Sequence, residues 1–265
     1  MTRPPIPILL LAGAALLLLV LPVVGLLQRA PWGELGHELA ASDVRTALRL
    51  SIVTSLSAAS LAILLGAPLA WVLARVDFRG KTLVRALALL PLVLPPVVGG
   101  VALLLALGRN GLVGSWLAHI GVALPFTTAG AIVAELFVAL PFAVITVEAG
   151  VRALDERLEE AAATLGAGPW LTLRRVVLPA LAPSLAAAAA LCWARALGEF
   201  GATITFAGNF KGVTQTMPLA VYLALETEPG SAIVLSLVLL AVSIAVLALV
   251  GRRVFGARPV GVAAT

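Results

Sequence analysis

Four ionisable side chains lie more than two residues from either end of a long apolar stretch of this sequence, where an unpaired charge is costly and commonly serves a function. They are Glu135, Glu148, Arg195 and Glu199. Glu148 and Arg152 are four residues apart near the end of their stretch, a spacing that predicts a local ion pair on one helix face. Arg195 and Glu199 have the same spacing deeper in a later stretch. They form either a self-neutralising pair inside a helix bundle or a fixed charge beside a path for an anion.

Small residues and hydroxyl groups surround the second pair. Gly198 and Gly201 permit a close approach of helices, and Thr203 and Thr205 carry hydroxyl donors that an anion could contact. Threonine hydroxyls in membrane helices more often bond their own backbone, so this alternative stays open. The hypothesis for this region is a translocation path or its outer gate beside Arg195, Glu199, Thr203 and Thr205.

The sequence lacks the residue patterns of several enzyme classes. Gly80, Lys81 and Thr82 resemble the end of a phosphate-binding loop, but Arg75 stands where that loop needs its first glycine. The two histidines, His37 and His119, form no metalloprotease motif, and no G-x-S-x-G element is present. The prediction is therefore a chain that is not an enzyme, without catalytic residues, metal site or cofactor of its own.

The composition of this chain is that of a membrane protein. Hydrophobic residues make up 61% and charged residues 12% of the 265 residues, and the mean hydropathy is +1.10. These values predict a polytopic membrane protein. Apolar stretches cover residues 6–27, 48–74, 83–107, 128–151, 178–206 and 230–250. Because backbone groups must be paired in lipid, we expect six transmembrane helices in an all-α fold, the first of them a retained helix rather than a signal peptide.

Two of these stretches are irregular. The third contains Pro91, Pro95 and Pro96, which predict a kink or a break. The fifth would be about 43 Å long as one helix, longer than the hydrocarbon core, so Pro179 and Pro183 predict a turn before the helix enters the membrane. The connection 109–126 is apolar enough to contain a short re-entrant or interfacial helix.

Basic residues are concentrated on one side of the expected helices, and this bias sets membrane orientation. With a cytoplasmic N-terminus, the inside segments hold Arg3, Arg75, Arg79, Lys81, Arg85, Arg152, Arg157, Arg174, Arg175, Arg252, Arg253 and Arg258. The outside segments hold Arg29, Arg45, Arg49, Arg109 and Lys211. Both termini are therefore predicted to be cytoplasmic. The net charge of +5 is explained by topology, without a nucleic acid partner.

The polar segment at about 153–175 falls on the same cytoplasmic side. Leu154, Leu158, Ala161 or Ala162, and Leu165 form a helical stripe that could be buried, while Glu156, Glu159 and Glu160 occupy much of the remaining surface. Gly166 suits a left-handed helix end, and Gly168-Pro169 suits the start of the next helix. The segment predicts a helical hairpin presented to solvent as a docking surface.

This hairpin resembles the "EAA" loop of ABC importer permeases. The resemblance rests on Glu160, Ala161, Ala162 and Gly166, followed after nine residues by Val176, Val177, Leu178 and Pro179. It implies a single transmembrane permease domain over 1–265, of the type I (MetI-like) architecture. It also implies that Glu156, Glu159, Glu160, Ala161, Ala162 and Gly166 couple the chain to two separate ATPase subunits, which hold ATP and Mg.

Two further segments narrow the resemblance. Residues 195–209, from Arg195 to Asn209, are similar to a signature of oxyanion permeases, and residues 214–222 are more similar to the molybdate and tungstate branch. The resemblance implies a homodimer in the inner membrane, an extracytoplasmic molybdate-binding protein, and import by alternating access. A sulfate or thiosulfate permease of the same fold is the nearest alternative. An ion-coupled secondary transporter is the alternative from another class, and Glu135 is the residue that could support it.

Overall fold

The computed structural model describes residues 5–33 and 35–254, and within them every regular element is a helix. The predicted all-α class is therefore confirmed. Residues 1–4, Glu34 and 255–265 lie outside the described residues. Among them are Arg3 and Arg258, which contributed to the predicted orientation of the termini. Both ends of the single domain that is predicted for 1–265 also lie there.

Five helices in the described part are long and apolar enough to cross a membrane. They are α1 (Ile6–Gln28), α3 (Ser42–Arg75), α7 (Thr128–Arg152), the continuous helix Pro169–Leu197 and α13 (Pro229–Val254). Their apolar character all around matches helices whose surroundings are lipid or protein. They correspond to five of the six predicted stretches.

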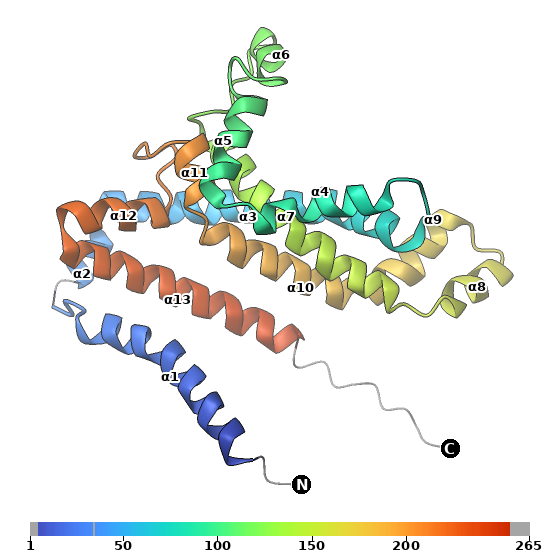
Figure 1. The fold of residues 1–265 in the computed structure, drawn as a ribbon, viewed down its shortest axis with the longest axis horizontal. Helices are drawn as coiled ribbons and strands as arrows, with labels where there is room; N and C mark the ends of the chain where they lie inside the picture. The colour runs from blue at the N-terminus through green and yellow to red at the C-terminus, as the bar shows by residue number, and fades with distance from the viewer. Residues whose placement is uncertain (1–4, 34, 255–265) are drawn as a thin grey trace.

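The third predicted stretch is divided, as its prolines predict. α4 (Lys81–Val93) and α5 (Pro96–Leu107) are separated by Leu94 and Pro95, both of which have extended backbone. Each of these residues precedes a proline, whose ring disfavours the helical conformation of the residue before it. α5 consequently turns away from the direction of α4 (Figure 1). The short helix expected in the outer connection is α6 (Gly114–His119).

The turn predicted at Pro179 and Pro183 is wrong. α9 (Pro169–Thr172), the π-helical segment Leu173–Val177 and α10 (Leu178–Leu197) form one continuous helix through both prolines. The wider π turn rearranges the hydrogen bonds just before Pro179, since the N–H of Leu178 bonds the carbonyl of Leu173, and such a turn accommodates the missing proline donor. The helix is interrupted only after Leu197, before α11 (Gly201–Phe206).

Helices α3, α7 and α10 form the centre of the bundle and run along its long axis (Figure 1). Small side chains dominate their contacts: Ala58, Ala59, Ala62, Ala139, Ala143, Cys192 and Ala196 form one buried cluster. A Cβ atom at Gly66 would lie 2.7 Å from the Cβ of Ala143. Small residues allow the backbones to approach this closely. In a bilayer, lipid tails are as apolar as the side chains, so close van der Waals packing replaces the hydrophobic effect in holding helices together.

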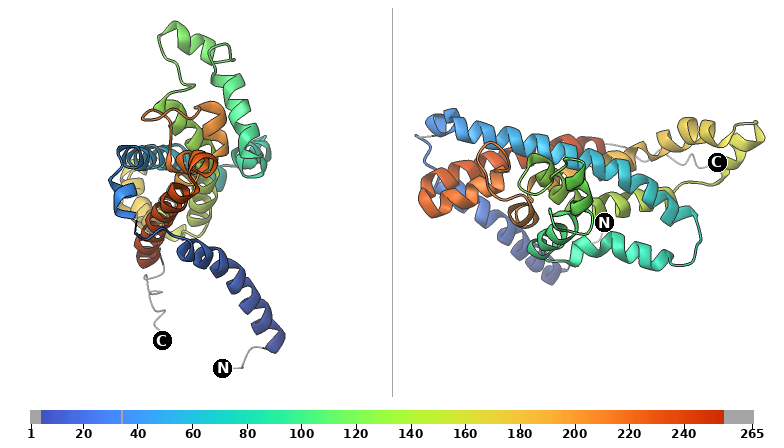
Figure 2. Two further views of the ribbon diagram at one scale, coloured as in Figure 1. Left: turned by 90° about the vertical axis from the view of Figure 1, so that its left-hand side faces the viewer. Right: turned by 90° about the horizontal axis from the view of Figure 1, so that it is seen from above.

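The two ends of the bundle differ. At one end the chain leaves α7, forms α8 (Arg157–Thr164) and returns through α9; at the other lie α2 (Leu35–Ala40) and α12 (Met217–Thr227), which the sequence analysis did not anticipate (Figure 1). α1 diverges from the bundle in every view (Figure 2), and none of its residues is buried. Most of its surface is therefore available to lipid or to another chain, apart from a contact with α13.

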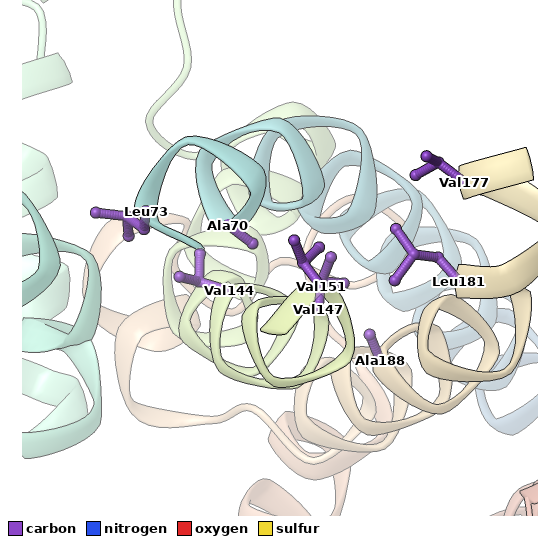
Figure 3. Close-up of a cluster of buried hydrophobic side chains, with 8 residues drawn as sticks. All are labelled: Ala70, Leu73, Val144, Val147, Val151, Val177, Leu181 and Ala188. Atoms are coloured by element: carbon purple, nitrogen blue, oxygen red, sulfur yellow. The ribbon is translucent and has the colours of Figure 1, made fainter. Parts of the chain in front are cut away.

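The end that carries α8 contains a separate core of branched side chains (Figure 3). It comprises Ala70, Leu73, Val144, Val147, Val151, Val177, Leu181 and Ala188, from α3, α7 and the π segment with α10. Leu154, which leads into α8, packs against this core. The polar hairpin is thus anchored on tightly packed helix ends.

Candidate functional site

The polar hairpin, residues 153–175, forms the helix, turn and helix that the sequence predicts. α8 begins after Asp155, whose carboxylate accepts a hydrogen bond of 3.0 Å from the backbone N–H of Arg157. Glu159 and Glu160 lie in its first turn, where acidic side chains favourably oppose the positive end of the helix dipole. The predicted helix at 154–165 is confirmed, with its first turn beginning three residues later.

Gly166 closes α8 in the left-handed conformation, with φ of +81°. The N–H of Gly166 bonds the carbonyl of Ala163 at 2.9 Å, and the N–H of Ala167 bonds that of Ala162 at 3.0 Å. These two bonds constitute a Schellman motif, which satisfies the last carbonyls of the helix. Pro169 then occupies the first position of α9, so both predicted turn signals are confirmed.

The predicted apolar stripe is only partly buried in this chain. Ala162 is buried and Leu154 packs on the core, but Leu158 is half exposed and Leu165 is 87% exposed. One side of α8 therefore packs through Ala162 against the returning arm of the hairpin. The other side presents Leu158 and Leu165 beside the acidic residues as an unpartnered mixed surface.

Two of the three candidate acids contact the end of α3. Arg75 donates to the carboxylates of Glu156 and Glu159, the second at 2.9 Å, and its guanidinium lies 5.8 Å from the centroid of the Trp71 ring. Glu160 is exposed and has no ion pair within the residues that the structure describes. The three acids are thus not equivalent, a distinction that the sequence pattern did not indicate.

A second ionic cluster joins α3, α4 and α7 at the same end. Glu148 accepts from Arg152 at 2.8 Å, which confirms the predicted pair, and from Arg85 of α4 at 2.5 Å. Both arginines also donate to the carbonyl oxygen of Leu73, at 3.3 and 3.4 Å. The sequence analysis counted Arg85 only as a charge that sets orientation and missed its pairing with Glu148, which is 63 residues away in the chain.

Arg195 and Glu199 form the predicted pair at 2.7 Å, at the break between α10 and α11. The side chain of Glu199 is only 1% exposed, whereas that of Arg195 is 28% exposed. The other carboxylate oxygen of Glu199 accepts from the N–H of Ala202 at 2.8 Å. Glu199 therefore holds Arg195 through one oxygen and caps α11 through the other.

The two candidate threonines differ in what their hydroxyls contact. Thr205 donates to the carbonyl of Gly201 at 2.8 Å, the backbone bond that was the alternative for this residue. Thr203 is fully buried, and its hydroxyl has no partner within the described residues. Thr203 and Thr205 lie in the short helix α11, whose N-terminus Glu199 caps. All four candidate residues of the path or gate therefore lie at the break between α10 and α11.

The two glycines near this break have different roles. A Cβ at Gly201 would lie 2.8 Å from the Cβ of Pro96, so α11 approaches the start of α5 closely, as the sequence predicts. Gly198 has open space around its Cβ position, and the expected close approach there is wrong. Gly100 of the third predicted stretch, which the sequence also marks for close backbone approach, makes a second such contact, since its Cβ would lie 2.6 Å from the Cβ of Thr205.

Further buried polar groups lie between α3, α7 and the segment that precedes α12. Thr54 donates to Glu135 at 2.8 Å, and the N–H of Met217 donates to Ser51 at 2.6 Å. Thr214, Gln215 and Thr216 are also buried. Residues 214–217, the first part of the segment 214–222 that resembles the molybdate branch, are therefore a buried connector that is bonded to α3. The serines and threonines of α3 were not singled out from the sequence, since hydroxyl residues in an apolar helix commonly bond their own backbone.

Comparison with known proteins agrees with this architecture. The family model of "binding-protein-dependent transport system inner membrane component" matches residues 62–258. The molybdenum transport system permease protein ModB of Mycobacterium tuberculosis is 45% identical over 91% of this chain and 92% of its own length. ModB of Escherichia coli is 38% identical over 75% and 89%, and the sulfate transport system permease protein CysT of that species is 36% identical over 91% of both chains.

Solved structures support the fold. A bacterial alginate ABC transporter, in complex with a periplasmic protein that binds an alginate pentasaccharide, matches with a TM-score of 0.72 at 19% identity over 95% of both chains. The MetNI methionine ABC transporter matches with a TM-score of 0.61 at 17% identity over 80% of this chain and 95% of that one.

Proposed function

We infer that this chain, which belongs to the family of binding-protein-dependent transport system inner membrane components, is the permease subunit of an ABC importer that translocates molybdate. The observation that carries this proposal is the identity of 38–45% to ModB permeases over 75–91% of the chain. A transport subunit of this kind binds and guides its cargo and is not an enzyme. Tungstate, a tetrahedral dianion of the same chemistry, belongs to the same proposal.

Sulfate is the second candidate cargo, because CysT is 36% identical over 91% of the chain. Both cargoes are doubly negative oxyanions, and hydroxyl donors and a fixed arginine serve either. Arg195, Glu199, Thr203 and Thr205 at the α10–α11 break are the residues that we assign to the path or its outer gate. In this proposal Arg195, which is partly exposed, lowers the electrostatic barrier to the anion while Glu199 holds it in place.

The hairpin at 153–175 is the proposed docking surface for a separate ATPase subunit. Its exposed Leu158 and Leu165 offer apolar contact, and Glu160 offers a charge for a basic group of that subunit. Ala161 and Ala162 keep α8 narrow, and Gly166 sets the angle of the return. ATP and Mg bind to the ATPase, and movement of the docked hairpin opens and closes the bundle by alternating access.

The proposed assembly contains two copies of this chain, two ATPase subunits and an extracytoplasmic binding protein that delivers molybdate. Both termini are placed in the cytoplasm, with the hairpin on the same side. Support comes from the basic residues around the hairpin and from the direction of α13, which runs from the end that carries α12 toward the end that carries α8 (Figure 1).

Reconstitution in proteoliposomes tests the proposal. The permease is assembled with its ATPase and binding protein, and uptake of radiolabelled molybdate and sulfate is measured with ATP, without ATP, and with an ion gradient alone. ATP-dependent molybdate uptake is the expected result. Uptake of sulfate but not molybdate would identify sulfate as the cargo. Uptake driven by the gradient without the ATPase would establish a secondary transporter.

A further inference from the structure

The structure contains a route from the docking hairpin to the central helix of the bundle. The hairpin is joined through the backbone to α7, which ends at Arg152, and to α10, which continues the hairpin's second helix. α3 has no such connection, since it ends at Arg75, far earlier in the sequence. Any movement of the hairpin can therefore reach the end of α3 only through contacts between side chains.

Arg75 supplies the polar part of that contact. Its side chain is 20% exposed, and its two terminal nitrogens divide between Glu156 and Glu159. A forked guanidinium that holds two carboxylates at once is oriented more strictly than a single exposed ion pair. The Trp71 ring, one helical turn earlier, lies beside the guanidinium and restricts it further.

The last turns of α3 are in turn fixed to the other helix ends. Leu73 is fully buried in the branched core of Figure 3, together with Val147 and Val151 of α7. Its carbonyl oxygen accepts from both Arg85 and Arg152, which share Glu148. A displacement of Arg75 thus acts on a segment that is bonded to α4 and α7 as well.

The far half of α3 contacts the buried polar groups near the proposed gate. Over its 34 residues α3 spans about 51 Å, and Ser51 and Thr54 bond Met217 and Glu135 there. Pro68 lies inside α3 between Arg75 and this half, but the helix is continuous and packs along its length against α7 and α10. A close-packed interior transmits displacement rather than absorbing it. α3 therefore connects the hairpin with the connector at 214–217.

We propose that Arg75 is a positioning residue that couples the hairpin to α3, so that Glu156 and Glu159 serve this internal link while Glu160 remains for the ATPase. The inference deepens the proposed function and rests on it. It assigns a role to Arg75 that the hairpin motif does not include, and it divides the three acids between two tasks. Loss of the link leaves the ATPase docked but disconnects its movement from α3.

Reconstituted complexes test this link through the ratio of oxyanion uptake to ATP hydrolysis. Arg75→Gln is expected to retain the ATPase in copurification and to lower the ratio severalfold. Glu159→Gln lowers it in the same direction, and the exchange Arg75→Glu with Glu159→Arg restores part of it. Arg79→Gln, which removes an exposed charge from the same end, is the matched control and keeps the wild-type ratio.

An unchanged ratio in Arg75→Gln overturns the inference, and so does loss of the bound ATPase, which would place Arg75 in the docking surface. The ratio is measured with whichever oxyanion the wild type transports, so a wrong cargo does not affect it. Trypsin cleavage after Arg157 in the permease alone, in nanodiscs, needs no cargo at all. Arg75→Gln should speed this cleavage, because α8 is released from α3, and equal rates contradict the link even if the proposed function fails.

Discussion

Glu199 accepts a hydrogen bond of 2.8 Å from the backbone N–H of Ala202 while it pairs with Arg195 at 2.7 Å. One buried carboxylate therefore both begins α11 and fixes the charge at the end of α10. A charged side chain at this depth is tolerated because each of its oxygens has a partner. The helix break and the ion pair are consequently one structural unit.

Replacement of Glu199 separates its two tasks. Glu199→Gln keeps an oxygen for the Ala202 N–H but removes the charge opposite Arg195, whereas Glu199→Ala removes both. We expect Glu199→Ala to lower the free energy of unfolding further than Glu199→Gln, by the cap contribution of about 0.5–2 kcal/mol. Thermal unfolding of the detergent-solubilised protein measures the difference, and equal losses would show that the cap contributes nothing.

Glycine substitutions probe the contact between α5 and α11. Gly100→Ala places a Cβ 2.6 Å from the Cβ of Thr205 and 2.9 Å from the carbonyl oxygen of Ala202, so the helices must separate. A destabilisation of about 1–3 kcal/mol is expected, as for other overpacked sites. Gly198→Ala is the matched control, because the space around it is open. Thermal unfolding midpoints compare the two, and an equally mild effect at Gly100 would argue against the tight contact.

Much of the architecture follows from short-range features of the sequence. Pro95 and Pro96 act on the residues beside them, and Gly166 and Pro169 act within one helical turn. The break between α4 and α5, the cap at the end of α8 and the start of α9 were therefore all predictable. The proline at 179 was misread because the compensating π turn depends on hydrogen bonds that no residue type marks.

The contacts of the candidate sites were harder to predict. The pairs Glu148–Arg152 and Arg195–Glu199 are one helical turn apart, so their spacing revealed them. Arg75 with Glu159 and Arg85 with Glu148 join helices distant in sequence, and only packing brings them together. Charge identified these residues as candidates, but it could not assign their partners.

Thr54 and Glu135 form a buried polar contact whose loss should be measurable. Thr54→Val keeps the shape of the side chain but leaves the Glu135 carboxyl, which is 1% exposed, without its hydrogen bond at 2.8 Å. A buried polar group left without a partner costs about 1–3 kcal/mol. Ser60→Ala removes an exposed hydroxyl from the same helix and serves as the control. A Thr54→Val protein that unfolds at the wild-type temperature would show that this contact does not stabilise the bundle.

Glu135→Gln separates the two classes of transporter. In an ABC importer Glu135 is a packing residue, so the amide should retain ATP-driven uptake within a few fold of wild type, provided the protein assembles. In an ion-coupled transporter an intramembrane carboxylate carries the coupling ion, and its loss abolishes transport. Uptake assays at matched protein levels decide between them, and abolished uptake in an assembled protein would favour the secondary transporter.

The assignment of the path predicts different effects at Arg195 and Thr203. Arg195→Gln removes the partly exposed positive charge and should reduce the uptake of a dianion most strongly at low substrate concentration. Thr203→Val removes a hydroxyl that has no protein partner in the described residues and should slow uptake without lowering stability. Initial rates over a range of molybdate concentrations are the measurement. Wild-type rates and selectivity in both variants would remove these residues from the path.

Gly166 allows a test of the hairpin that does not touch its acidic residues. Its φ of +81° costs a residue with a Cβ about 1–2 kcal/mol, although the space around it is open, so Gly166→Ala strains the turn without a clash. Gly166→Pro is more severe, because it also removes the N–H that bonds Ala163. Both variants, and Glu160→Lys, should insert in the membrane but hydrolyse ATP without matching uptake. Gly168→Ala, at a φ of −70°, is the control that keeps normal coupling. Full ATP-driven uptake by both Gly166→Pro and Glu160→Lys would exclude the hairpin as the coupling element.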